Sequence, residues 1–96
     1  MKPIVIHPGE ILLEEFMKPL ELNSNALALA IRVPANRVLA ITKGKRAVSA
    51  DTALRLARYF GTTPDFWINL QGLHDLKKAE LEAGRQIKRE VRPRAA

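Results

Sequence analysis

The sequence predicts an all-α fold, a compact domain of five short helices, and three observations support this class. Residues that cap or open helices recur along the chain, at the start of successive apolar stretches. Within those stretches the apolar residues follow helical spacing, and none shows the pattern of a sheet. The connections between them are as short as those between packed helices. Because 96 residues can bury one modest core, we expect a single domain.

The first helix is expected to begin at Pro8 and to end near Pro19. Proline suits a first helical turn, because the N–H group that it lacks would have no partner there. One side of the helix carries a polar stripe, made of Glu10, Glu14, Lys18 and Glu21. The opposite side is apolar and holds Ile11, Leu12, Leu13, Phe16, Met17 and Leu20. This pattern predicts an amphipathic helix.

The second and third helices form the most informative part of the chain. Asn23 or Ser24 is expected to cap the second helix. Pro34 opens the third, and Lys43–Gly44 closes it, since glycine adopts the left-handed conformation common after a helix.

The fourth and fifth helices show the same punctuation. Ser49 is expected to cap the fourth helix and Gly61 to end it. The fifth begins at the run 63–65, which places a capping threonine before a proline and an aspartate. It then carries the aromatic pair Phe66 and Trp67; core packing suits Phe66, and Trp67 suits either the core or a dimer interface.

Residues 24–43 predict a helix-turn-helix, which needs apolar residues where two helices cross and polar residues on the outer face of the second. The expected inner residues are Leu27, Ala28, Ile31, Val33, Val38 and Ile41. At 100° per residue, Asn36, Ala40 and Lys43 of the second helix point outward and Arg37 lies on a flank. An outward amide with bases at the helix end suits recognition of the major groove of DNA. The alternative is an ordinary helical hairpin with a solvated outer face.

Charge is concentrated in the middle of the chain. The net charge is +6 overall, with −2 in residues 1–31, +6 in residues 32–61 and +2 in residues 62–96. A basic middle of this kind predicts a surface for a polyanion, although a generally basic soluble surface would give the same composition. From Gly84 onward basic residues dominate, so we expect a domain at residues 1–83 and a frayed or disordered basic tail at 84–96.

Several other functions lack the residues that they need. The chain has no cysteine, and its two histidines, His7 and His74, are far apart in sequence. Glu14 and Glu15 point about 100° apart on a helix, and no glycine-rich phosphate loop occurs. We therefore expect no enzyme, no metal site and no cofactor. Neither a membrane-length apolar run nor a signal-peptide pattern is present, so we expect a soluble cytoplasmic protein.

Several motifs in order resemble those of one family. They are His-Pro-Gly-Glu-Ile-Leu-Leu-Glu-Glu-Phe at 7–16, Val-Pro-Ala-Asn-Arg-Val at 33–38, Gly-Lys-Arg at 44–46, Ala-Asp-Thr-Ala-Leu-Arg-Leu-Ala at 50–57 and Thr-Pro-Asp-Phe-Trp-Ile-Asn-Leu-Gln at 63–71. Together they are similar to HigA-type antitoxins, also called the virulence-associated protein I family. The resemblance covers residues 7 to 80 and implies a five-helix domain of the lambda-repressor-like helix-turn-helix class. It also implies a homodimer that represses its own operon and binds a toxin, typically a RelE-like messenger-RNA endoribonuclease.

Carried over residue by residue, the resemblance implies two sets of DNA contacts. The residues implied to face bases are Ala35, Asn36, Arg37 and Ala40. Those implied to hold phosphates are Ser24, Asn25, Lys43, Lys45 and Arg46. Two positions depart from the family pattern. Ser24 stands where many relatives have a longer glutamine, and Arg32 stands where the interhelix turn often has glycine, at a cost of roughly 1 kcal/mol if it is left-handed.

The toxin surface is predicted from charge, because a ribonuclease is expected to be basic around its active site. The acidic residues of the first helix, Glu10, Glu14 and Glu21, are therefore the expected toxin contact. The alternative is that the toxin binds the basic tail or the fifth helix. The glutamates of the first helix would then only keep that helix soluble. Two functions remain open: an antitoxin that also represses its operon, or a phage-type or housekeeping helix-turn-helix repressor without a toxin.

Overall fold

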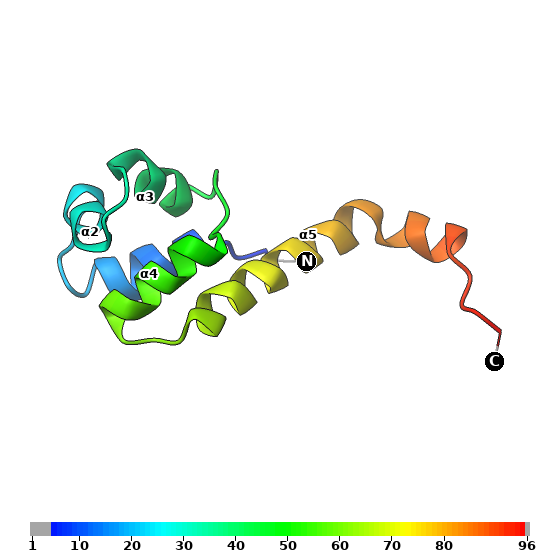
Figure 1. Cartoon of the computed structure of the whole chain (residues 1–96). Helices are drawn as coiled ribbons and strands as arrows, with labels where there is room; N and C mark the ends of the chain where they lie inside the picture. The colour runs from blue at the N-terminus through cyan, green and yellow to red at the C-terminus, as the bar shows by residue number, and fades with distance from the viewer. Residues whose placement is uncertain (1–4, 96) are drawn as a thin grey trace.

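A computed structural model describes residues 5–95 and confirms the all-α class. The helices are α1 (Pro8–Ile11), which continues directly into the π-helical segment η1 (Leu12–Met17), then α2 (Ser24–Ile31), α3 (Ala35–Thr42), α4 (Ala50–Phe60) and α5 (Pro64–Glu90). The first four units gather at one end of the molecule, and α5 leaves this body as a long arm (Figure 1). The ends of the predicted domain and tail, residues 1–4 and 96, lie outside the described residues.

Short polar side chains cap the N-termini of several helices, as the sequence predicts. The Asn23 carboxamide oxygen accepts from the backbone N–H of Ala26 at 2.8 Å, so Asn23 rather than Ser24 caps α2. Ser49 accepts from Thr52 N–H at 3.3 Å, and Thr63 accepts from Phe66 N–H at 3.2 Å. These caps satisfy N–H groups that have no partner within their helices, which fixes where each helix starts.

The first helix departs from a regular amphipathic helix. Its second half is π-helical, and this wider turn allows both Leu12 and Met17, five positions apart, to be 1% exposed. Leu20 lies in the turn after the helix and is 59% exposed, so its predicted place on the apolar side is wrong. Glu21 also lies in this turn, with φ of 54°, and therefore does not continue the polar stripe.

The core joins all five helical units, and Trp67 is its largest fully buried side chain. The indole N–H of Trp67 donates to the Thr62 hydroxyl at 2.8 Å, which satisfies its polar atom inside the core. Phe66, in contrast, is 37% exposed. The predicted dimer-interface role for Trp67 is therefore wrong, and Phe66 is only partly in the core, because Trp67 is the residue that packs against both Phe16 of η1 and Phe60 of α4. The buried apolar cluster comprises Leu12, Met17, Leu27, Ala28, Ile31, Val38, Ile41, Val48, Ala53, Leu56, Ala57 and Trp67.

Helix α5 is longer than predicted. It runs without a break through Gly84 to Glu90, and residues 91–95 follow it without regular secondary structure. The segment beyond Gly84 is exposed, yet its arginines, its one lysine and its glutamine favour helix, and Gln86 donates to Glu90 at 3.0 Å one turn later. The expectation of a frayed or disordered segment from Gly84 is corrected to that extent, because one glycine does not end a helix of strong helix formers.

Candidate nucleic-acid interface

Helices α2 and α3 pack as a helix-turn-helix. The predicted inner residues Leu27, Ile31, Val38 and Ile41 are 0–4% exposed, and Val33 packs against the core from the turn. Arg32 occupies the turn with φ of 62°, the left-handed conformation that usually favours glycine. The turn therefore has the expected geometry, although an arginine makes it.

The outer face of α3 is free of the core, as the helical wheel predicts. Asn36 and Lys43 are exposed and Ala40 is half-buried. The other two residues implied to face bases are less available. Ala35 packs partly against the core, and Arg37 is half-buried beside α4. Base contact by these four residues stays a prediction, with Asn36 the most accessible.

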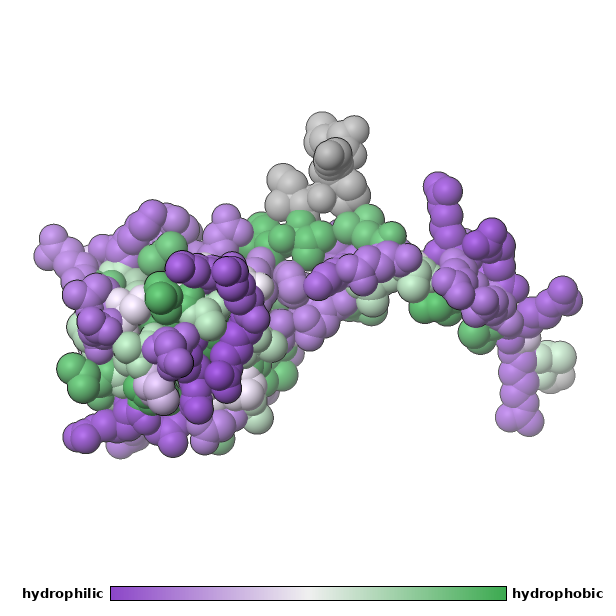
Figure 2. Space-filling model, turned by 90° about the horizontal axis from the view of Figure 1, so that it is seen from above, coloured by the Kyte–Doolittle hydropathy of each residue, from purple (hydrophilic) through white to green (hydrophobic). Residues whose placement is uncertain are grey.

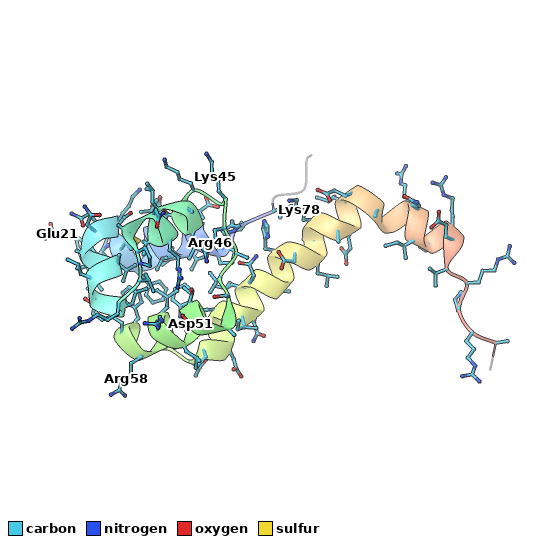
Figure 3. All side chains as sticks on the ribbon, turned by 45° about the horizontal axis from the view of Figure 1, so that its top comes forward. Glu21, Lys45, Arg46, Asp51, Arg58 and Lys78 are labelled. Atoms are coloured by element: carbon cyan, nitrogen blue, oxygen red, sulfur yellow. The ribbon has the colours of Figure 1, made fainter. Side chains whose placement is uncertain are left out.

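Cations follow α3 directly. Lys43, Lys45 and Arg46 are exposed, and Gly44 turns the chain between them with φ of 72°. Lys45 projects from the end of α3 away from the body of the domain (Figure 3). Within residues 5–95 none of the three pairs with an acidic side chain, so their charge is available to phosphates. At the start of α2, Ser24 is half-buried and Asn25 is exposed.

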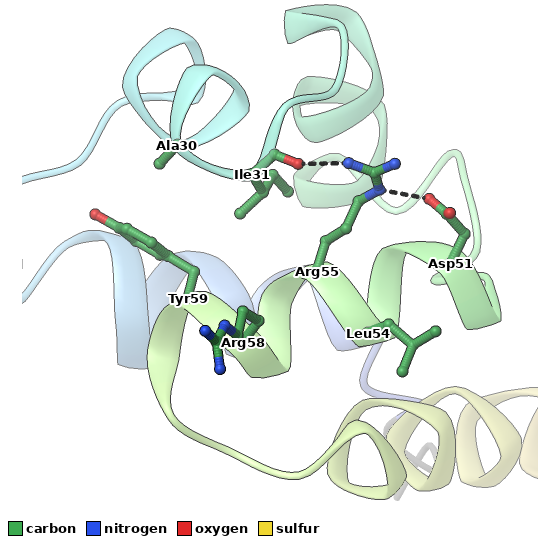
Figure 4. A pocket seen from close by; sticks show the side chains of 7 residues that line it. All are labelled: Ala30, Ile31, Asp51, Leu54, Arg55, Arg58 and Tyr59. Atoms are coloured by element: carbon green, nitrogen blue, oxygen red, sulfur yellow. Dashed lines mark hydrogen bonds and ion pairs between the residues drawn. The ribbon is translucent and has the colours of Figure 1, made fainter.

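Arg55 of α4 is a residue of this site that the sequence analysis missed. Its Nη1 donates to the backbone oxygens of Ile31 at 2.9 Å and of Arg32 at 3.3 Å, and its Nε donates to Asp51 at 2.7 Å (Figure 4). Asp51 also lies 3.7 Å from Nη1 of Arg37. These bonds hold the left-handed turn at Arg32, and they offset part of its strain. The spacing of Asp51 and Arg55 could have suggested their pair, but nothing local indicated the contact with α2.

The two histidines meet, which their separation in the sequence gave no reason to expect. The rings of His7 and His74 are 4.8 Å apart and meet edge to face, and the His7 ring lies against Gly44 at the end of α3. His7 caps α1, because its Nδ1 accepts from the Gly9 N–H at 2.9 Å. Burial, helped by the nearby His74, lowers the pKa of His7, while Asp75 partly opposes the shift. Within residues 5–95 no cluster of three or more potential metal ligands occurs.

We predict that this cap makes stability depend on pH. The pKa of His7 is lower in the folded chain than its ordinary 6.5, so the unfolded chain binds more protons and the stabilisation present above pH 6.5 is lost as pH falls below it. A protonated Nδ1 also cannot accept from Gly9. Serine keeps an acceptor but does not titrate, so His7→Ser should lose less unfolding free energy than wild type between pH 7.5 and 5.5 in urea titrations. Equal losses in both proteins would contradict the role of His7. The pKa of Asp75 is also lowered, chiefly by Gln71, but its effect falls below this window.

The acidic residues of the predicted toxin contact are not one continuous stripe. Glu10 and Glu14 are exposed on the first helix, but Glu14 pairs with Lys18 at 2.7 Å and Glu21 lies in the following turn. Glu10 is thus the member of the set on the first helix that no described cation neutralises, and Glu21 in the turn is also without such a partner.

An apolar surface follows the start of the chain and α5. A groove there is lined by Val5, Ile6, Pro8, Ile11, Leu70, Leu73, His74 and Lys77. Ile6 is 49% and Leu73 66% exposed, and Figure 2 shows hydrophobic atoms gathered along this part of the molecule. Exposed apolar patches of this kind are typical of protein–protein contacts. None of the helices within residues 5–95 has the length and apolar composition to cross a membrane.

Comparison with known proteins gives one family. A helix-turn-helix family model matches residues 13–67. The chain is 52% identical over 75 residues to virulence-associated protein I of Dichelobacter nodosus, covering 78% of this chain and 69% of that protein. It is 41% identical to antitoxin HigA-1 of Vibrio cholerae, covering 71% of this chain and 64% of that protein, so it spans about two thirds of these relatives.

Solved structures of similar proteins belong to the same family as the relatives found by sequence. A HigA-family addiction-module antidote protein of Coxiella burnetii superposes with a TM-score of 0.92 at 50% identity, over 96% of this chain and 100% of that one. The antitoxin HigA of Pseudomonas aeruginosa, solved with the higBA promoter, gives a TM-score of 0.93 at 43% identity, again over 96% and 100% of the chains.

Proposed function

The chain belongs to the helix-turn-helix family of HigA-type antitoxins, and on that premise we propose that it binds operator DNA in a sequence-specific manner, represses its own operon and neutralises a RelE-like endoribonuclease toxin. The observation that carries the proposal is α3 itself, which presents Asn36 outward and is followed by three exposed cations. A relative with 43% identity was solved with its promoter, which supports DNA as the ligand. In this proposal the protein acts in the cytoplasm by binding DNA and the toxin, and it uses no catalytic residue, metal or cofactor.

The proposed DNA complex contains a homodimer. The apolar surface of α5 and the start of the chain would be buried between the two copies, which removes its exposure to water. A two-fold dimer places two copies of α3 in successive major grooves, so the operator should contain half-sites about 10 base pairs apart.

Base recognition in this proposal depends on α3. The Asn36 amide can pair with adenine through two hydrogen bonds, and the Ala40 methyl group can contact a thymine methyl. Ala35 is small, so the start of α3 can approach the base edges closely, and Arg37 would reach a guanine or a phosphate. Ser24 and Asn25 would contact phosphates from the start of α2.

The phosphate contacts are tested by salt dependence. Replacing both Lys45 and Arg46 by alanine should weaken binding evenly across DNA sequences, since phosphates carry no base identity. Each lost phosphate contact should flatten the slope of log K against log salt by about 0.9 per protomer. Fluorescence-anisotropy titrations at four salt concentrations measure the slope. The control replaces Arg92 and Arg94 by alanine, which removes the same charge from the exposed segment after α5. An unchanged slope for the Lys45 and Arg46 variant would show that these cations only solubilise the protein.

The proposed toxin contact rests on charge complementarity. Glu10 and Glu14 are exposed on the first helix, and no described ion pair joins them to the basic residues that follow α3, so their charge is available to a basic toxin. Lys18 already neutralises part of the charge of Glu14, so Glu10 should contribute more. Glu21 would border the contact from the following turn.

Charge reversal tests this surface. Replacing Glu10 and Glu14 by lysine should slow association with the co-expressed toxin at least tenfold at low salt and leave operator binding unchanged, because attraction between opposite charges speeds encounter. Surface plasmon resonance gives the association rate. Replacing Glu80 and Glu82 of α5 by lysine makes the same charge change elsewhere and serves as the control. Association that survives the reversal but is lost on truncation after Leu81 would place the contact on the end of α5 instead. If no protein encoded beside this chain binds it, the repressor without a toxin is the better description.

A further inference from the structure

Asp51, at the start of α4, faces two arginines from different helices. Its Oδ1 accepts from Nε of Arg55 at 2.7 Å and lies 3.7 Å from Nη1 of Arg37. The first distance is a short charge-assisted hydrogen bond, whereas the second is an ion pair too long for a hydrogen bond. One carboxylate thus has a firm partner on its own helix and a loose partner on α3. Figure 3 shows Asp51 on α4, facing the helices above it.

The firm partner is fixed by further bonds. Nη1 of Arg55 donates to the carbonyl oxygens of Ile31 and Arg32 at the end of α2, so Arg55 cannot turn away without freeing those groups. Because Arg55 is fixed, the carboxylate of Asp51 stays beside α3.

The loose partner is poorly satisfied where it lies. The Nε of Arg37 is buried and has no hydrogen-bond partner within residues 5–95, and its guanidinium has only the 3.7 Å contact with Asp51. A buried donor without a partner raises the free energy of this conformation, so Arg37 gains by moving to a better acceptor. Its position, directly after Asn36 on the flank of α3, brings it close to the proposed DNA surface.

We infer that Asp51 restrains Arg37 in the free protein and so lowers the affinity of this chain for every duplex that Arg37 contacts. The inference rests on the proposed function, because it assumes that α3 binds DNA. Any duplex must break the contact between Arg37 and Asp51 before Arg37 can bind. The cost of breaking this contact is the same whether Arg37 then binds a guanine or a phosphate. Asp51 therefore weakens binding to the operator and to random DNA by the same factor, and their ratio does not depend on it.

The test uses Asp51→Asn, which keeps an oxygen to accept from Arg55 but removes the charge that holds Arg37. The probes are a duplex that the wild-type chain selects from a random pool and a scrambled duplex of the same length. The affinities for both duplexes should rise by the same factor, about fivefold at the upper end for one exposed ion pair, so the specificity ratio should not change.

Two controls separate this mechanism from simple repulsion of DNA by an acid. Asp65→Asn changes the equivalent acid in the first turn of α5 and should alter neither affinity. In an Arg37→Ala background, Asp51→Asn should change the affinity for neither duplex, because the residue that it releases is absent. An equal rise in both backgrounds would overturn the inference, as would unchanged affinities on replacing Asp51 in the wild-type background. Failure of the wild-type chain to select any duplex would instead overturn the proposed function, and the inference with it, before any variant is made.

Discussion

Replacing Gly9 by alanine is expected to destabilise the domain by about 3 kcal/mol, the largest effect of any single methyl group that we predict. A Cβ atom at position 9 would overlap the backbone carbonyl of Ile41 and reach the Cα of Thr42 at 3.0 Å. Both belong to the last turn of α3, and backbone atoms cannot rotate aside as a flexible side chain could. Either α1 or the end of α3 must therefore move.

Urea and thermal unfolding measure this effect. A loss of about 3 kcal/mol of unfolding free energy corresponds to a thermal unfolding midpoint that is lower by roughly 12–24 °C for a domain of this size. The matched control is Gly72→Ala on α5, where a new Cβ meets no atom within 4 Å. That variant should be more stable by up to about 1 kcal/mol, because alanine favours helix over glycine. A Gly9→Ala protein within 0.5 kcal/mol of wild type would show that α1 and α3 do not approach as closely as described.

Replacing Asn36 by alanine is expected to cost about 1–3 kcal/mol of operator binding, a loss of roughly five- to 150-fold. The side chain is exposed on α3, so its removal should leave the fold intact. Competition binding to the selected duplex and to its single-base variants measures the loss and shows which base pair is no longer distinguished. Asn69→Ala, an exposed asparagine on α5, is the control and should bind normally. If selected and scrambled duplexes lose affinity equally, Asn36 contacts only the backbone.

The helix starts, the end of α4 and the inner face of the helix-turn-helix could be predicted from the sequence because each depends on neighbouring residues. Ser49 and Thr63 cap within three positions, and Gly61 ends α4 with its own left-handed backbone. The spacing of Leu27, Ile31, Val38 and Ile41 places them inside for the same reason. Helical spacing alone did not decide which residue of the aromatic pair in α5 would be buried. Either Phe66 or Trp67 could have faced the core, and only the packing of α5 on α1 and α4 selects Trp67.

The features that the sequence could not reveal join residues far apart in the chain. Arg55 binds the end of α2 across 24 positions, His7 meets His74, and Gly9 makes room for α3. No spacing or propensity carries such information, because each contact depends on how helices stack. The same packing explains why Arg37 is half-buried beside Asp51 and not simply exposed on its flank of α3. The candidate site was therefore predictable as a helix face, but not as a set of contacts.

Chemical protection of the selected duplex tests the central claim, that α3 recognises bases in the major groove, most directly. Dimethyl sulfate modifies guanine N7 in the major groove and adenine N3 in the minor groove. The account predicts protection of guanine N7 in two half-sites about 10 base pairs apart, with adenine N3 still reactive there, and loss of protection on a scrambled duplex. Protection confined to adenine N3, or no difference between selected and scrambled duplexes, would contradict it.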